Sequence, residues 1–250
     1  MSRLRLHVIA CRVFDQELTV LAAGAKTEAQ IRYLEIGLHE RTAEYLHVAL
    51  QGAIDSLSTD NFDAVALAYG LCNLGIVGLQ ARTLPVVVPR AHDCIGMLLG
   101  SNQRYLAELE SCLGTYFQSP GWLEHLPADR VLRQQNLPVG AGLKMTKEDL
   151  VARYGEENAA YLLGQFAGFT RHYCRLAYIS TPVPQAENHE RAAAEIAHQQ
   201  GWTFDRLPGD LGWIRRLLDG EWNDQEFLTL KPGERLGVSY DTQLIATGWR

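Results

Sequence analysis

The chain has 250 residues, which is enough to bury a large core as one domain or as two closely joined halves. Its 47% hydrophobic and 21% charged residues are typical of a globular protein. The net charge of −6 argues against a nucleic-acid partner, although one local arginine would suffice for a small anionic ligand. Residues 1–12 are too short and too charged for a signal peptide, and no later stretch is long enough to span a membrane. We therefore expect a cytoplasmic protein with no membrane partner.

The amino-terminal part alternates short apolar runs with a helical pattern. The expected strands are Leu4–Ala10, Ile31–Leu38, Ala64–Tyr69 and Leu84–Val88, and the expected helix is Thr42–Leu57. Strands that alternate with helices indicate a parallel sheet.

The middle of the chain has a different pattern. It predicts a helix over Asn102–Leu113 capped by Ser101, a loop over Gly114–Trp122, an irregular connection over Pro127–Gly142, and helices over Lys147–Tyr154 and Glu157–Phe169. The middle segment is therefore expected to be mainly helical.

The last third returns to alternation. It predicts strands Arg175–Ile179, Thr203–Leu207 and Phe227–Leu230, and helices Glu190–Gln200 and Leu211–Leu218 that end at Gly201 and Gly220. The prediction is an α/β fold with mostly parallel sheets and flanking helices. We expect one compact unit over 1–250, with lobes 1–113 and 170–250 around a cleft and a helical insert 114–169 as the alternative division.

The five cysteines are expected to stay reduced, because an odd number without a secretory signal does not suggest a disulfide framework. Cys11 ends the first expected strand, His39 follows the second, and Cys72 follows the third. A cluster over Arg90–Cys94 follows the fourth. Ligands bind at the carboxyl ends of strands in open parallel sheets, so these residues are expected at one edge.

Thiolate and imidazole are the ligands that zinc prefers, and a catalytic zinc site has three protein ligands and an open position. Cys72, His92 and Cys94 supply such a set, which Cys11, His39 or Cys174 would complete. The alternative is that Cys72 is a core cysteine and His92 caps the next helix. The residues do not distinguish zinc from iron.

Gly70, Asn73 and Gly75 surround Cys72 and are candidates for close contact with a cofactor, because glycine lets the backbone approach a ligand. The segment matches neither a phosphate loop nor a dinucleotide fingerprint, and a plain strand-to-helix turn also explains it. If the segment opens a helix, Cys72 is also a candidate metal-free nucleophile, because a helix amino terminus lowers a thiol pKa.

We expect Arg90, His39 and Tyr116 to act in catalysis. Arg90 would bind a substrate carboxylate or phosphate, unless it forms a surface ion pair. His39 would exchange protons near the cluster. Tyr116 belongs to the aromatic segment Gly114–Trp122, which would cover a small-molecule pocket or anchor its own loop to the core.

Several segments together resemble the family called domain of unknown function 1638. They are Tyr69–Asn73, Pro89–Ile95, Leu98–Ser101, Gly114–Phe117, Pro120–Trp122 and Leu218–Trp222, with Cys11 and Phe227. Members of this family are often encoded beside corrinoid-dependent methyltransferases, so the resemblance implies a link to one-carbon metabolism.

The resulting hypothesis is a zinc-dependent protein that acts on a small molecule, with thiol- or corrinoid-linked methyl transfer as the preferred reaction. A corrinoid protein or methyltransferase would then be its partner. His92, Cys94 and Cys174 follow the ligand order of zinc methyltransferases, by analogy only. The alternatives are a non-catalytic accessory protein that binds metal, corrinoid or a methyltransferase, and a metal-free thiol enzyme.

Overall fold

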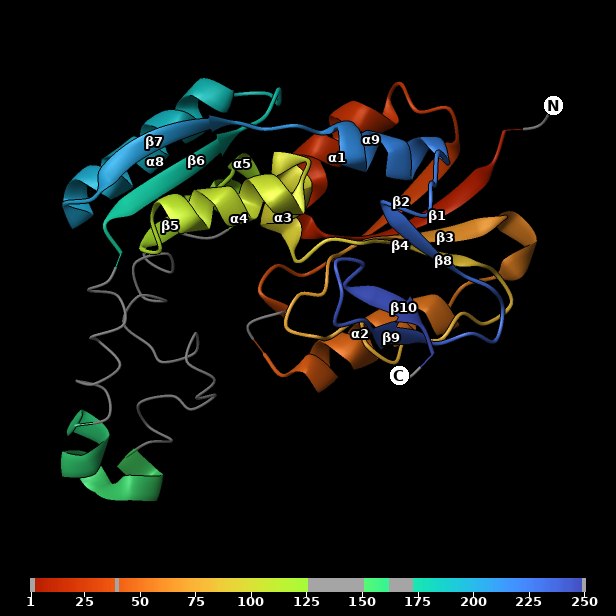
Figure 1. Ribbon diagram of the computed structural model, residues 1–250, viewed down its shortest axis with the longest axis horizontal. Helices are drawn as coiled ribbons and strands as arrows, with labels where there is room; N and C mark the ends of the chain where they lie inside the picture. Colours follow the sequence, from red (N-terminus) through yellow and green to blue (C-terminus); the bar gives the residue numbers. More distant parts are fainter. Residues whose placement is uncertain (1–2, 39–40, 126–150, 162–172, 249–250) are drawn as a thin grey trace.

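The computed structural model describes residues 3–38, 41–125, 151–161 and 173–248. It contains two mostly parallel sheets that lie beside each other (Figure 1). The expected α/β fold with mostly parallel sheets and flanking helices is confirmed. His39 and the expected irregular segment 127–142 lie outside the described residues. Residues 151–161, where parts of two helices were expected, are helical.

The first sheet has five strands in the order β2-β1-β3-β4-β8. Their bounds are β1 Arg5–Cys11, β2 Glu28–Leu34, β3 Ala64–Ala68, β4 Val86–Pro89 and β8 Phe227–Leu230. The first four are parallel, and β8 pairs antiparallel with β4. Strands β3 and β4 are wholly buried apolar runs, as expected for a sheet covered on both faces.

The strand order fixes where the chain changes direction within the sheet. From β1 the chain moves outward to β2, then returns to the other side of β1 to form β3, where Ala10 is in register with Ala68. The crevice outside the carboxyl ends of β1 and β3 is therefore a topological switch point, the usual ligand position in such sheets.

Helices cover both faces of the first sheet. Helices α1 (Asp15–Ala22) and α9 (Gly212–Asp219) lie on one face, and α2 (Ala43–Asp55) lies on the other with the hairpin of β9 (Leu236–Val238) and β10 (Ile245–Thr247) (Figure 1). Thr42 caps α2 by accepting a hydrogen bond from the Tyr45 amide. Short 3-10 helices occupy Arg12–Phe14 and Thr59–Asn61.

The second sheet has the order β5-β6-β7 and is fully parallel. It consists of β5 Thr115–Gln118, β6 Arg175–Ser180 and β7 Thr203–Pro208, with helices α5 Pro120–His125 and α8 Ala186–Gln200. The expected loop over Gly114–Trp122 is wrong: it contains β5 and the start of α5. The strand has only four residues, and Gly114, Pro120 and Gly121 flank it. These flanking residues are typical of turns, so the composition of the segment predicted a loop.

The carboxyl ends of the parallel strands of one sheet face those of the other sheet (Figure 1). Helices α3 (Cys94–Leu99) and α4 (Asn102–Ser111) connect them, and the Asp210 amide bonds the Leu98 carbonyl at 2.9 Å. The expected lobe boundaries do not match this arrangement, because β5 belongs to the second sheet and β8 returns to the first. In the described part of the chain, no helix has the length and apolar character needed to cross a membrane.

Candidate functional site at the switch point

Three cysteines lie around the switch point of the first sheet. Cys11 is the last residue of β1, Cys72 follows β3, and Cys94 begins α3 directly after β4. Neighbouring thiols contribute to two of the three pKa shifts: the Cys94 pKa is raised by burial first, then by Asp93, Cys72 and Cys11, and the Cys72 pKa is raised by burial, then by Asp93 and Cys11. These residues, far apart in sequence, are therefore close neighbours in space.

Burial keeps these thiols protonated. It raises the pKa of Cys11 to about 11, and it is also the main cause of the raised pKa of Cys72. The Tyr69 hydroxyl is close enough to lower the pKa of Cys11, yet it has no partner of normal hydrogen-bond geometry although it is buried. A buried hydroxyl that lacks a well-formed hydrogen bond is costly, so a polar ligand that bonded to it would be stabilised here.

The backbone that carries Cys72 is strained. Cys72, Asn73 and Leu74 all have left-handed conformations, with φ of 40°, 60° and 63°. Three successive residues with side chains in this region are unusual, because each one costs on the order of 1–2 kcal/mol. Such strain concentrates at binding and catalytic sites.

The glycines beside Cys72 serve the protein's own packing. A Cβ at Gly70 would lie 2.7 Å from the Asp93 amide nitrogen, because the segment pairs with residues 91–92 through bonds from the Leu71 and Cys72 amides. A Cβ at Gly75 would overlap the Leu46 side chain at 2.5 Å. Asn73 donates to the Arg41 carbonyl. The close approach to the glycines that was expected from a cofactor is thus made by other segments of the same chain.

Asp93, not His92, caps α3. The Asp93 carboxylate accepts hydrogen bonds from the amides of Ile95 and Gly96 at 2.9 and 3.1 Å, and burial raises its pKa. The His92 backbone amide bonds the Asn102 side chain at 3.1 Å. No group of three or more His, Cys, Asp and Glu side chains in the described residues already has a geometry that would hold a metal ion.

Arg90 is occupied by the protein itself. Its guanidinium donates to the carbonyls of Asp224 at 2.9 Å and Gln243 at 3.2 Å, and also to that of Ile245. Because these bonds join the end of β4 to the segment before β8 and to the carboxyl-terminal hairpin, the guanidinium makes a structural contact here. The pKa of Arg90 is lowered, mainly because burial disfavours the charged guanidinium.

Tyr116 and Cys174 belong to the second sheet. Tyr116 packs against Tyr173 and Trp202, with ring centroids 5.5 and 5.7 Å apart, which agrees with the alternative that this segment anchors itself to the core. Cys174 lies beside Cys112, with 3.3 Å between their sulfur atoms. His39, expected as an acid–base group, lies outside the described residues.

Polar residues that were not expected from the sequence lie where the second sheet and α1 meet. The side chains of Gln118 and Ser119, at the carboxyl end of β5, are buried and have no hydrogen-bond partner among the residues that the structure describes. Glu17 of α1 is fully buried; one oxygen accepts from Thr181 at 2.7 Å and the other has no partner. Ser119 was visible only as a turn residue, and Glu17 gave no signal because α1 was not expected.

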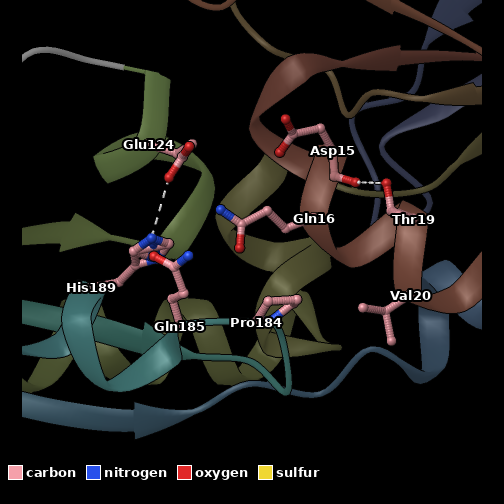
Figure 2. A pocket seen from close by; sticks show the side chains of 8 residues that line it. All are labelled: Asp15, Gln16, Thr19, Val20, Glu124, Pro184, Gln185 and His189. Carbon is pink, nitrogen blue, oxygen red and sulfur yellow. Dashed lines mark hydrogen bonds and ion pairs between the residues drawn. The ribbon is translucent and has the colours of Figure 1, made fainter.

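A cavity of about 280 Å³ lies between α1 and the start of α8 (Figure 2). It is lined by Asp15, Gln16, Thr19, Val20, Glu124, Pro184, Gln185 and His189. Glu124 pairs with His189 at 3.4 Å, and burial lowers the His189 pKa. Carboxylates, amides and an imidazole suit a small polar ligand. None of the five cysteines lines this cavity.

The fold and site define an α/β protein with two mostly parallel sheets and a thiol cluster at a topological switch point. The chain belongs to the family described as "Protein of unknown function (DUF1638)", whose model matches residues 33–218. The match includes Cys72, Cys94 and Cys174, whereas Cys11 precedes it. No curated protein and no solved structure matches the chain.

Proposed function

We propose that this chain is a zinc-dependent protein that acts on a small polar molecule where the two sheets face each other. The observation that supports this most is the convergence of Cys11, Cys72 and Cys94 at the switch point, beside the buried Tyr69 hydroxyl. The carboxyl edge of a parallel sheet is where ligands bind, and thiolates are strong zinc ligands.

The residues fit zinc by their chemistry. Without a cation, burial holds the thiols of Cys11, Cys72 and Cys94 in the protonated form. A bound divalent metal deprotonates coordinating thiols, so these groups would become ligands only when the metal binds. Because the described side chains are not yet in ligand geometry, metal binding requires a local rearrangement. The strained segment Cys72–Leu74 is the element best suited to it.

The facing sheet would supply the substrate contacts. Gln118 and Ser119 have buried polar atoms without partners, and a small molecule with hydroxyl, amide or carboxylate groups would satisfy them. A zinc-bound thiolate stays nucleophilic at neutral pH, so methyl transfer involving a thiol, with a corrinoid protein or methyltransferase as partner, is the reaction we propose to assay first. Reduced thiols also require a reducing compartment, so we place the chain in the cytoplasm.

The metal-free alternative has less support. A catalytic cysteine needs a lowered pKa, whereas burial raises the pKa of Cys72. A non-catalytic accessory protein would use the same metal site, and it differs from the enzyme in binding a methyl donor or corrinoid partner without turnover.

The test is the metal content of the purified protein, measured by inductively coupled plasma mass spectrometry. We expect about one zinc per chain, lost in Cys72→Ser and Cys94→Ser, and retained in the matched control Cys174→Ser. Circular dichroism of each variant would separate loss of metal from loss of fold. A wild-type protein that stays metal-free after incubation with zinc, or a folded Cys94→Ser variant with full zinc content, would contradict the proposal.

A further inference from the structure

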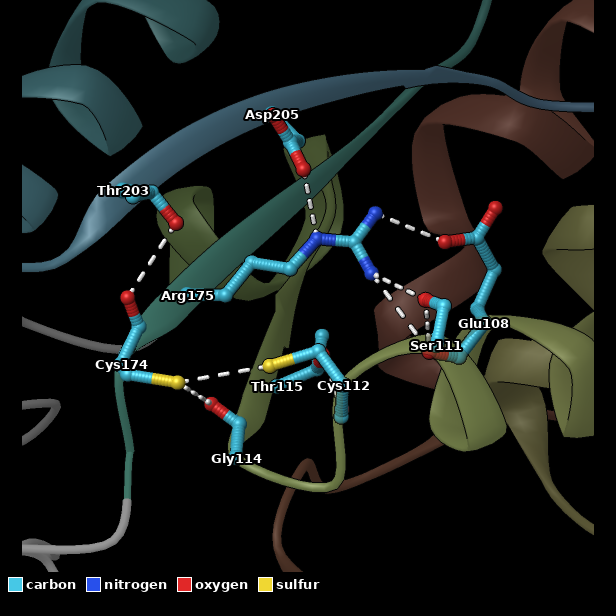
Figure 3. Close-up of polar contacts among 9 residues, drawn as sticks. All are labelled: Glu108, Ser111, Cys112, Gly114, Thr115, Cys174, Arg175, Thr203 and Asp205. Carbon is cyan, nitrogen blue, oxygen red and sulfur yellow. Dashed lines mark hydrogen bonds and ion pairs between the residues drawn. The ribbon is translucent and has the colours of Figure 1, made fainter.

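A separate pair of thiols lies at the start of the second sheet, and it shares no residue with the proposed zinc site. Cys112 follows the last residue of α4, and Cys174 directly precedes β6. Their sulfur atoms are 3.3 Å apart, although the residues are 62 positions apart in the chain (Figure 3). Neither is bonded to another cysteine.

Backbone bonds hold the two cysteines together. The Cys174 amide bonds the Gly114 carbonyl at 2.9 Å, and the Arg175 amide bonds the same oxygen at 3.2 Å. The Thr115 hydroxyl bonds the Cys112 carbonyl at 2.6 Å. Because both segments are anchored beside the thiols, the sulfur atoms meet without movement of a strand.

The pair is open to solvent. Cys174 is exposed and Cys112 is partly exposed, whereas Cys11 and Cys94 are buried. A reagent in solution therefore reaches the pair more readily than those two thiols at the switch point. Accessibility and thiolate character are the properties that determine the reactivity of a cysteine.

The surroundings make the two thiols unequal. The hydrogen bond between the two thiols is the main cause that lowers the pKa of Cys112, and Thr115 and the Arg175 charge lower it further. The same hydrogen bond raises the pKa of Cys174. Arg175 stays beside the pair because Glu108 and Asp205 bind its guanidinium at 2.7 and 2.6 Å (Figure 3). Cys112 is therefore the thiol better prepared to attack.

We propose that Cys112 and Cys174 form a redox-active dithiol that exchanges with small disulfides of the glutathione type. The Cys112 thiolate attacks one sulfur of the small disulfide, forms a mixed disulfide and releases the other half as a thiolate. Cys174 then gives its proton to water and attacks the Cys112 sulfur, which breaks the mixed bond and releases the second small thiolate. The two protein thiols are oxidised, and the one small disulfide is reduced to two thiols.

Little movement is needed to close the protein disulfide. A disulfide bond is about 2.05 Å long, so the sulfur atoms must approach by little more than about 1 Å from their present separation. The new bond would join the end of α4 to the start of β6 and so fasten β5 to its neighbour. The oxidised protein should therefore resist unfolding better than the reduced one.

The experiment uses the full chain, reduced and then equilibrated without oxygen in buffers of reduced and oxidised glutathione. The free thiols are then alkylated, and the protein is digested without reductant. Mass spectrometry should show two peptides joined by a Cys112–Cys174 disulfide. The fraction of this disulfide at a given glutathione ratio should be the same whether the protein starts reduced or oxidised. Native thiol titration should fall by two groups per chain, and dithiothreitol should restore them.

Single substitutions at positions 112 and 174 separate the roles of the two thiols. Cys174→Ser should accumulate a stable mixed disulfide with glutathione on Cys112, because no second thiol resolves it. Cys112→Ser should form the mixed disulfide more slowly and on Cys174 alone. The proposal would be overturned if the linked peptide is absent at high oxidised glutathione, if the bond forms between chains, or if one of the three switch-point cysteines is the partner. Zinc content is measured on the same samples, so failure of the zinc site is seen independently.

Discussion

The carbonyl oxygen of Val13 lies directly against Gly121, so that a Cβ at position 121 would be only 1.8 Å from it. Val13 belongs to the turn after β1, and Gly121 is in the first turn of α5 after β5. This contact between two backbones sets how closely the facing ends of the two sheets approach.

Gly121→Ala should therefore strongly destabilise the protein. The added methyl group meets backbone, which cannot move as a side chain does, so we expect a loss of more than about 2 kcal/mol in the free energy of unfolding. Urea unfolding would measure it. Gly52→Ala is the control, because Gly52 lies in α2 with open space around it and should gain up to about 1 kcal/mol. Equal midpoints for Gly121→Ala and wild type would contradict the contact.

Arg175→Met tests the ion pairs that hold α4 to β6 and β7. The Arg175 side chain is 11% exposed and binds both Glu108 and Asp205. Its loss should lower the free energy of unfolding by about 2 kcal/mol, a figure that allows for the solvent exposure of Asp205. Arg5→Met is the matched control, because the Arg5–Asp63 pair is on the surface and should change the unfolding midpoint very little. Similar effects of the two substitutions would show that burial does not strengthen the Arg175 pairs.

Glu17 predicts a pH dependence. Burial raises the pKa of this carboxyl, so the folded state holds the proton more tightly than the unfolded state. The free energy of unfolding should then fall as pH rises from about 4.3, the ordinary glutamate pKa, through the raised folded value, and Glu17 should add no further change above it.

Glu17→Gln should remove this loss. Glutamine still accepts the hydrogen bond from Thr181, so the variant should be more stable than wild type at pH 7 and lose that advantage below about pH 4. Urea unfolding from pH 4 to pH 8 would measure the difference, with the exposed Glu195→Gln as control. A wild-type-minus-variant difference that does not change with pH would rule out Glu17 as the source.

Leu74→Gly tests the strain beside Cys72. Glycine adopts the left-handed conformation of residue 74 freely, whereas leucine does not, and the Leu74 side chain is 53% exposed. Leu113→Gly is the control, since Leu113 is 86% exposed and its φ is not positive. We expect Leu74→Gly to be more stable than the control by about 1 kcal/mol in thermal or urea unfolding. The reverse order would argue against strain.

The central elements of the first sheet were predictable because local patterns determine them. The apolar run at Ala64–Ala68 and the helix ended by Gly220 in the left-handed conformation lie where the sequence indicates. Second-sheet strand β5 was missed because its four residues are recognisable only when paired with β6, which lies far along the chain. Helix α1 was missed because its signal is short and weakly amphipathic.

The candidate site was partly predictable for the same reason. Cys11 and Cys72 were expected at strand ends, and the parallel sheet brings those ends together. The contact of Cys112 with Cys174 was not predictable, because it depends on the pairing of two segments 62 residues apart. Arg90 looked available in the sequence, and only the three-dimensional position of the carboxyl-terminal hairpin shows which carbonyls occupy it.

Strand β8 has a consequence for how the protein is made. It covers the edge of β4, which would otherwise expose unpaired backbone groups that attract other chains. Because β8 spans Phe227–Leu230, a ribosome must synthesise nearly the whole chain, second sheet included, before that edge is protected. A nascent chain stalled before residue 227 would therefore leave the apolar strand β4 as the edge of the sheet in place of β8, and we expect such fragments to depend on chaperones more than the finished protein does.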